Sequence, residues 1–289
     1  HTPNRWRRSL TMDKQTVILT LEELGFALTA LGAEDMASGL LQSYYGELTE
    51  DRWELLFHAA THSLISKGLM EQRDDGQQQL EFDAFIVEML AHLVQSRQML
   101  RGYKEQQDKQ NTLTIHHGNE RFLYHFSSHN ELHFFRWSSP EDWHHDIDQL
   151  FGLLASNFNE HSRYVDLTEE QWNELTSSSF SMQQMTTWKL HESAQQIIQD
   201  WREDFDRNQC SLDNLSQMIY ADTDEDGPSV TNLLFVLKGT NDVWIVRNTE
   251  LDMQATPCLR IESVTEADWR ERITYFIQEF VRDEAVFRG

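Results

Sequence analysis

Apolar and polar residues are arranged so as to predict a short strand running into a capped helix, once in each half of the chain. In the first half, Thr16–Leu19 is β-branched and apolar. Thr20 then stands at the helix N-cap position, and Glu23 three residues later completes a capping box. In the second half, Tyr164–Leu167 takes the place of the strand and Thr168 that of the cap. The two starts agree in kind and in order.

Further elements of the first half follow from the same pattern. Thr49 caps an amphipathic helix that ends before Gly68, a residue suited to a left-handed helix terminus. A hairpin about an Asp75–Gly76 turn comes next. Apolar residues at spacings of three, four and seven then predict a long helix over residues 82–105, and the polar segment 104–110 predicts a linker.

Each half closes with three strands and a helix. In the first half the strands are predicted over residues 112–117, 121–128 and 131–137, followed by a helix over 140–154. In the second half they are predicted over residues 229–237, 242–248 and 258–264, followed by a helix over 266–280. The residues between the strands favour turns, so we expect an antiparallel meander in both places.

Because the order of elements repeats, the sequence predicts an α+β fold of two similar halves. Each half is a strand, a helix, further helices, a three-stranded antiparallel meander and a helix. We place the N-terminal half at residues 12–160 and the C-terminal half at residues 161–289, related by a pseudo-two-fold axis within one globular unit. Residues 1–11 precede Met12 and begin with His, so we interpret them as a tag or vector-derived segment.

The net negative charge of the chain argues against two classes of binding partner. The chain has 24 Lys and Arg against 48 Asp and Glu, a formal net charge of −24. This charge repels phosphate backbones and anionic headgroups, so we expect neither nucleic acid nor membrane as a partner. Cys210 and Cys258 are too few for a disulfide framework, and the pattern of the first residues leads us to expect no secretion leader. We therefore expect a cytoplasmic protein.

Motifs of the commonest enzyme classes are missing from the sequence. It has no glycine-rich phosphate loop, no nucleophile elbow and no His-Glu-x-x-His helix. We therefore expect no enzymatic activity and no cofactor. A weak alternative is a metal-dependent enzyme. If the third strand reaches back to His129, then His129, Glu131 and His133 share one strand face and could begin a zinc or iron site, whereas a turn at "SSHN" would put His129 out of register. The acidic residues Asp222, Asp224 and Asp226 alternate as in a calcium loop but lack its glutamate, so we interpret them as a solvated loop.

The order of elements, together with several local phrases, resembles the EspG family of cytosolic chaperones of type VII (ESX) secretion. The phrases are "VILTLEEL", "LISKGLMEQRDDGQQQLEF", "PEDWHHDIDQLFGLL", "VWIVRN" and "TEADWRERITYFIQEF". The resemblance implies a pseudo-symmetric α+β fold and a role in binding a helical-bundle secretion substrate, which in that family is a PE–PPE heterodimer. The low Pro and Gly content and the histidine-rich strands depart from typical members, and this leaves open a client of WXG or LXG type.

A contact with a helical bundle needs aromatic anchors on an exposed surface. The candidates for partner binding are aromatic or apolar residues of the predicted meanders: Phe122, Phe126, Phe134, Phe135, Trp137, Leu233 and Trp244. The alternative for each is that it packs beneath a helix. An immunity or antitoxin protein would also be acidic and free of cofactors, and it is the second functional interpretation.

Overall fold

The chain folds into two compact units in the computed structural model, which describes residues 16–72, 80–106, 109–118, 121–220, 227–249 and 258–282. Unit 1 comprises His1–Met99, Gln110–Ser139 and Tyr220–Gly227. Unit 2 comprises Leu100–Lys109, Pro140–Ile219 and Pro228–Gly289. The helix that closes the first predicted half therefore belongs to unit 2. The division at residue 160 and the pseudo-two-fold axis stay predictions.

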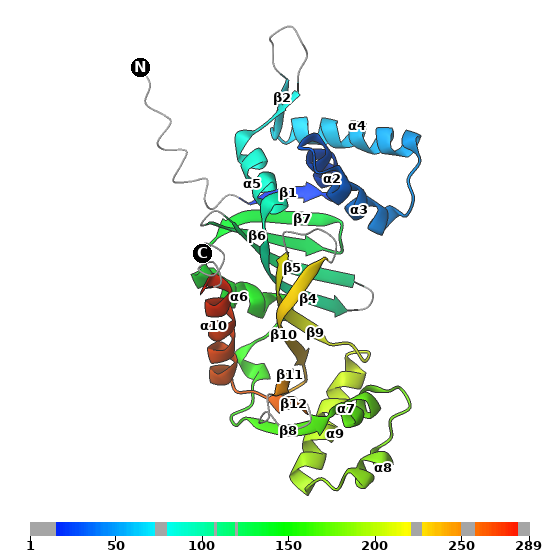
Figure 1. The fold of residues 1–289 in the computed structure, drawn as a ribbon, viewed down its shortest axis with the longest axis vertical. Helices are drawn as coiled ribbons and strands as arrows, with labels where there is room; N and C mark the ends of the chain where they lie inside the picture. Colours follow the sequence, from blue (N-terminus) through cyan, green and yellow to red (C-terminus); the bar gives the residue numbers. More distant parts are fainter. Residues whose placement is uncertain are drawn as a thin grey trace. The chain divides into compact units, whose positions relative to one another are not determined.

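In the described part of unit 1, helices lie beside strands in the order β1-β7-β6-β5 (Figure 1). Its elements in the described residues are β1 (Val17–Thr20), α2 (Leu21–Ala30), α3 (Glu34–Tyr45), α4 (Glu50–Ser66), β2 (Met70–Gln72), β3 (Leu80–Phe82), α5 (Ala84–Gln95), β5 (Lys109–Gly118), β6 (Arg121–Ser128) and β7 (Leu132–Ser138). The pairs β1/β7, β6/β7 and β5/β6 are antiparallel, and β2 and β3 form a separate hairpin. The predicted Asp75–Gly76 turn lies outside the described residues.

Unit 2 has the strand order β4-β9-β10-β11-β12-β8. Its elements in the described residues are most of β4 (Gln98–Gln106), α6 (Pro140–Phe151), η1 (Ala155–Asn157), β8 (Arg163–Thr168), α7 (Glu169–Thr176), α8 (Met182–Met185), η2 (Thr186–Trp188), α9 (Glu192–Arg207), β9 (Asp213–Tyr220), β10 (Pro228–Lys238), β11 (Val243–Thr249), β12 (Cys258–Ser263) and α10 (Glu266–Arg282). The α+β class and the large antiparallel sheet are confirmed. Within the described residues, no helix is both long and apolar enough to cross a bilayer.

One predicted helix is wrong in its second part. The pattern over residues 82–105 predicts a single helix, but α5 ends at Gln95 and β4 begins at Gln98. Gln98, Leu100 and Gly102 are buried in alternation with less buried residues, which is the period of a strand. Leu100 therefore matches the helical spacing by chance, and the sequence pattern does not reveal the strands β4 and β9.

Two helices begin directly at the end of an edge strand, as predicted. Thr20 ends β1 and caps α2, since its side chain accepts from the Glu23 N–H while the Glu23 carboxylate accepts from the Thr20 N–H at 2.7 Å. Thr168 ends β8 and caps α7 in the same way, with Gln171 in the place of glutamate. Each box satisfies two backbone donors that the first helical turn leaves without partners.

The two faces of the unit 1 sheet differ in what covers them. Alternate residues of a strand point to opposite faces. The face whose apolar residues pack against α2, α3, α4 and α5 is called the covered face below. Its members on the strands are Val17, Leu19, Leu123, Phe135 and Trp137. The residues between them lie on the opposite face, which we call the open face.

Histidines from three neighbouring strands lie in a row on the covered face. The ring centroids of His116 and His125 are 5.8 Å apart and those of His125 and His133 are 5.2 Å apart. His125 Nε2 lies 2.9 Å from His133 Nδ1. Burial disfavours the imidazolium, so it lowers the pKa of His116 to about 3 and that of His133 to about 4, and it also lowers the pKa of His125.

Unit 2 buries an acidic side chain against a glycine. Asp204 on α9 accepts from Trp244 Nε1 at 2.9 Å and from the Thr240 N–H at 3.2 Å, and it pairs with Arg207. Gly239 lies against this carboxylate, and a Cβ there would overlap it while lying 3.0 Å from the Asp242 carbonyl oxygen. Only a residue without a side chain lets α9 approach this turn so closely.

The Gly239→Ala variant is expected to lose about 1–3 kcal/mol of unfolding free energy, because the methyl group forces Asp204 away from its partners. Urea unfolding at pH 7 measures the loss. Gly39→Ala is the matched control: Gly39 lies within α3 with open space around it, so alanine should stabilise by about 0.5–1 kcal/mol. Equal stability of Gly239→Ala and the parent would contradict the packing described.

The histidine row is expected to make the protein acid-labile. The folded-state pKa values lie below the ordinary value of 6.5, so the unfolded chain binds more protons. Stability is therefore complete above about pH 6.5 and falls as the pH decreases towards 4. His116→Leu should reduce the slope by about 1.4 kcal/mol per pH unit near pH 5. Urea midpoints between pH 5 and pH 7.5 test this, and identical slopes would contradict it.

Candidate partner-binding surface

An apolar row crosses three strands on the open face. Phe126 on β6 pairs with Phe134 on β7, with ring centroids 5.9 Å apart, and Phe134 pairs with Ile18 on β1. Leu132 pairs with Thr20 beside this row. Ile18 is 45% exposed and Leu132 is 41% exposed, while the two phenylalanines are partly exposed. We name Ile18, Phe126, Leu132 and Phe134 the open-face patch.

A cation borders the open-face patch. The guanidinium of Arg136 lies 4.1 Å from the ring centroid of Tyr124, its cross-strand partner on β6. A stacked arginine of this kind keeps its charge beside the ring. The patch is therefore apolar along one row and polar along the next, which is the composition of a contact surface with a hydrophobic centre and a polar rim.

A lysine side chain blocks one backbone acceptor of β1, the edge strand beside the patch, so another strand cannot pair at that position. The ammonium of Lys67 donates to the Ile18 carbonyl at 3.2 Å and to the Glu23 carboxylate at 2.6 Å. Lysine at a sheet edge is a common way to prevent another strand from pairing there. A partner of this surface would therefore contact side chains of the face more readily than the backbone of β1.

The sequence-predicted aromatics separate between the two faces. Phe122, Phe126 and Phe134 lie on the open side of β6 and β7 and are partly exposed. Phe135 and Trp137 lie on the covered face and are buried, so they belong to the core of unit 1. Their expected role as surface anchors is corrected, because the prediction did not separate alternate residues of one strand.

The two candidates in unit 2 differ in the same way. Trp244 is fully buried, and its indole donates to Asp204, so it is a core residue and not the expected surface anchor. Leu233 on β10 is exposed. Partner binding by the remaining candidates, Phe122, Phe126, Phe134 and Leu233, stays a prediction.

The proposed metal ligands do not come together. His129 lies in the turn between β6 and β7 with φ of 56°, Glu131 accepts from the Tyr44 hydroxyl at 2.6 Å, and His133 faces His125 on the covered face. The assumption that the strand reaches back to His129 is wrong. Across the described ranges, no group of three His, Cys, Asp or Glu side chains is arranged to hold a metal ion. The aspartates of the considered calcium loop, residues 221–226, lie outside those ranges.

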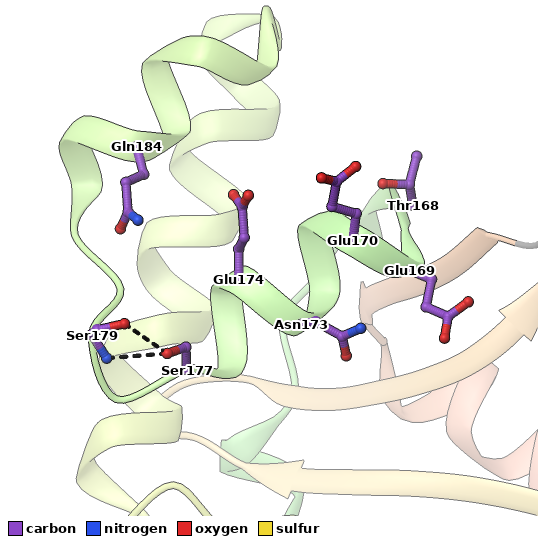
Figure 2. Close-up of a pocket in the computed structure, with 8 residues that line it drawn as sticks. All are labelled: Thr168, Glu169, Glu170, Asn173, Glu174, Ser177, Ser179 and Gln184. Carbon is purple, nitrogen blue, oxygen red and sulfur yellow. Dashed lines mark hydrogen bonds between the residues drawn. The ribbon is translucent and has the colours of Figure 1, made fainter.

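An open pocket of about 750 Å³ lies in unit 2 along α7 (Figure 2). Its lining is polar and acidic: Thr168, Glu169, Glu170, Asn173, Glu174, Ser177, Ser179 and Gln184. Ser177 and Ser179 bond to each other through their hydroxyls at 2.9 Å, and Trp188 donates to Glu174 at 3.0 Å. The lining can attract a cationic group, but none of its residues is an imidazole that could act as base for the serines.

Sequence reasoning missed the two most exposed members of the open-face patch. Ile18 lies in a short apolar run that does not by itself show which side chains face the core, and Leu132 is an aliphatic residue in a strand rich in aromatic side chains. Strict alternation counted from the buried Leu19 would have placed Ile18 on the opposite face.

The fold is similar to the solved structure of the Mycobacterium tuberculosis type VII secretion system chaperone EspG5 in complex with the PE25–PPE41 dimer, with a TM-score of 0.55. The similarity covers 86% of this chain and 90% of that chain at 9% sequence identity, so it shows a shared fold. The EspG-like fold expected from the sequence is thus confirmed, without membership of that family.

No curated protein sequence matches the chain. A family model with the description "Uncharacterised protein YfjC" matches residues 16–266, which is most of the sequence. The matched range begins at the strand that precedes the first capped helix and ends in the closing helix of unit 2. The chain belongs to the YfjC family.

Proposed function

We propose that this protein is a cytosolic chaperone or adaptor that binds a helical-bundle substrate of a type VII secretion system. The open-face patch is the observation that carries the proposal, because it is an apolar surface built on a rigid sheet. Binding would bury these side chains against the apolar tip of the substrate. The role needs no catalytic group and no cofactor.

The shared fold supports this role. The similar EspG5 structure is that of a chaperone in complex with the PE25–PPE41 dimer, and the similarity extends over nearly all of both chains. A fold hosts many functions, so the support comes from the combination of fold and exposed apolar surface. The type of client and the secretion system belong to the proposal.

Net charge fits the same role. A formal charge of −24 keeps a protein soluble while it exposes apolar side chains, and it discourages association with nucleic acids and anionic membranes. The apolar patch then gives attraction only where a partner offers a complementary surface. We therefore propose a protein partner in the cytoplasm, with neither nucleic acid nor membrane as a ligand.

Capture of the substrate is expected to depend on the open-face patch. A variant with Ile18→Ser and Leu132→Ser should recover at least about tenfold less substrate, because two anchors of the apolar contact are lost. Tagged protein expressed in the native host's cytosol is isolated, and co-purifying proteins are quantified by mass spectrometry. The proposal predicts a helical secretion substrate among them.

Leu55→Ser is the matched control for this experiment. Leu55 is 70% exposed on α4 of the same unit and is not part of the patch. It should recover the substrate as the parent does. Equal recovery by the patch variant and the parent, with both folded by circular dichroism, would contradict the role of the open face.

An immunity or antitoxin protein is the second candidate, and the acidic pocket lined by Glu169, Glu170 and Glu174 favours it. A basic toxin held by carboxylates would lose affinity steeply with salt. An apolar client should bind with an affinity that changes less than about threefold between 50 and 500 mM NaCl. Isothermal titration with the recovered partner distinguishes the two, since a loss of more than about a hundredfold supports the toxin.

A further inference from the structure

Three arginines gather on one face of the unit 2 sheet. Arg247 on β11 and Arg260 on β12 are direct cross-strand partners. Arg272 on α10 reaches the same place, because its Nη2 donates to Glu262, two residues along β12 from Arg260, at 3.2 Å. We name Arg247, Arg260 and Arg272 the arginine cluster.

The carboxylates that are present use only some of the donors of this cluster. Arg260 donates to Asp166 through Nε at 2.7 Å and Nη2 at 2.8 Å. Arg247 Nε lies 3.8 Å from the Glu262 oxygen that Arg272 already uses, which is too far for a hydrogen bond. Each guanidinium carries five N–H donors. Among the described residues, the buried Nε–H groups of Arg247 and Arg272 find no acceptor.

The charge of Arg272 is less well compensated than that of Arg260, whose hydrogen bonds to Asp166 raise its pKa. Burial lowers the pKa of Arg272, and the charges of Arg247 and Arg260 lower it further against the opposing effect of Glu262 and Asp268. The Asp268 carboxylate is itself engaged by Ser162 and Thr265. Partial burial has already removed much of the water from these guanidinium groups, so an anion that binds them displaces less hydration than at an exposed arginine.

Exposed tyrosines flank the arginine cluster. The Tyr164 ring centroid lies 3.9 Å from the Arg260 guanidinium, and Tyr164 is 54% exposed. Tyr275 follows Arg272 by one turn on α10 and is 57% exposed. The three arginine side chains also remain partly exposed. Tyrosine and arginine together are the residues most enriched at the centres of protein interfaces.

We propose that the arginine cluster binds a carboxylate from an acidic segment of the partner protein. The planar guanidinium fork matches a carboxylate, and the flanking tyrosines provide contact area for the residues beside it. Elsewhere the net charge of −24 repels an acidic segment, so the cluster fixes where that segment can lie. The identity of the partner rests on the proposed function, whereas the carboxylate site does not.

A probe that needs no client tests the site directly. The full-length protein, labelled with ¹⁵N, is titrated with a blocked tetraglutamate peptide while the arginine Nε–Hε resonances are followed. Saturable shifts of Arg247 and Arg272 are the expected result. Inorganic phosphate at matched ionic strength is the second arm and should displace little peptide. No saturable shift, or equal binding of phosphate, would overturn the assignment to a carboxylate.

Arg247→Gln is the variant of choice, because Glu262 is the one carboxylate within salt-bridge distance of Arg247 in the described residues and the link is long. It should weaken peptide binding by about fivefold. Arg270→Gln makes the same charge change on α10, where Arg270 pairs with Glu266 and Asp148, and should bind as the parent does. Equal weakening by both variants would mean that the peptide responds only to the net charge of the protein, and this would contradict the proposed site.

The titration separates this inference from the proposed function. Tetraglutamate binding that Arg247→Gln weakens, in a protein that recovers no helical substrate, would retain the carboxylate site and reject the chaperone role. Substrate recovery without tetraglutamate binding would retain the chaperone role and reject the carboxylate site.

Discussion

The structure depends on the pleat of the strands, which sends alternate residues to opposite faces of a sheet. In unit 1 the helices can cover only one of these faces, so every second residue of β1, β6 and β7 is left on the other side. Phe135 and its neighbour Phe134 show the consequence: one belongs to the core and the other to the open-face patch. The surface that we propose for partner binding thus consists of the residues that alternate with the core residues along the same strands.

Helix α2 of unit 1 and helix α7 of unit 2 both begin with a capping box, but the two boxes use different side chains. In unit 1 the box is completed by Glu23, the third residue of α2, whose buried carboxylate also accepts from Ser63 on α4 and from Lys67 just beyond it. In unit 2 the neutral Gln171 takes that position, and its box is exposed. A buried charge that lacks one of its partners is costly, so unit 1 ties β1, α2 and α4 into one cooperative group, whereas the α7 cap in unit 2 acts locally.

Most elements could be predicted because their signals are local. Thr20 with Glu23, the glycine after α4, and the alternation along β5, β6 and β7 are each contained within a few residues. The strands β4 and β9 could not be predicted, since the first continues a helical spacing and the second has a mixed pattern. The arginine cluster was equally hidden, because Arg247, Arg260 and Arg272 meet only through cross-strand register and the position of α10. The buried histidine row needed the same long-range information.

The turn between β6 and β7 has an importance beyond its size. Three residues, His129 to Glu131, join the paired residues Ser128 and Leu132, and His129 and Asn130 both adopt left-handed backbone conformations. A shift of this pairing by one residue would bring His133 and Phe135 to the outside and bury Leu132 and Phe134. The length of this turn therefore decides whether apolar residues or histidines lie on the open face. Relatives with a residue inserted or deleted here should have an open face with a different function.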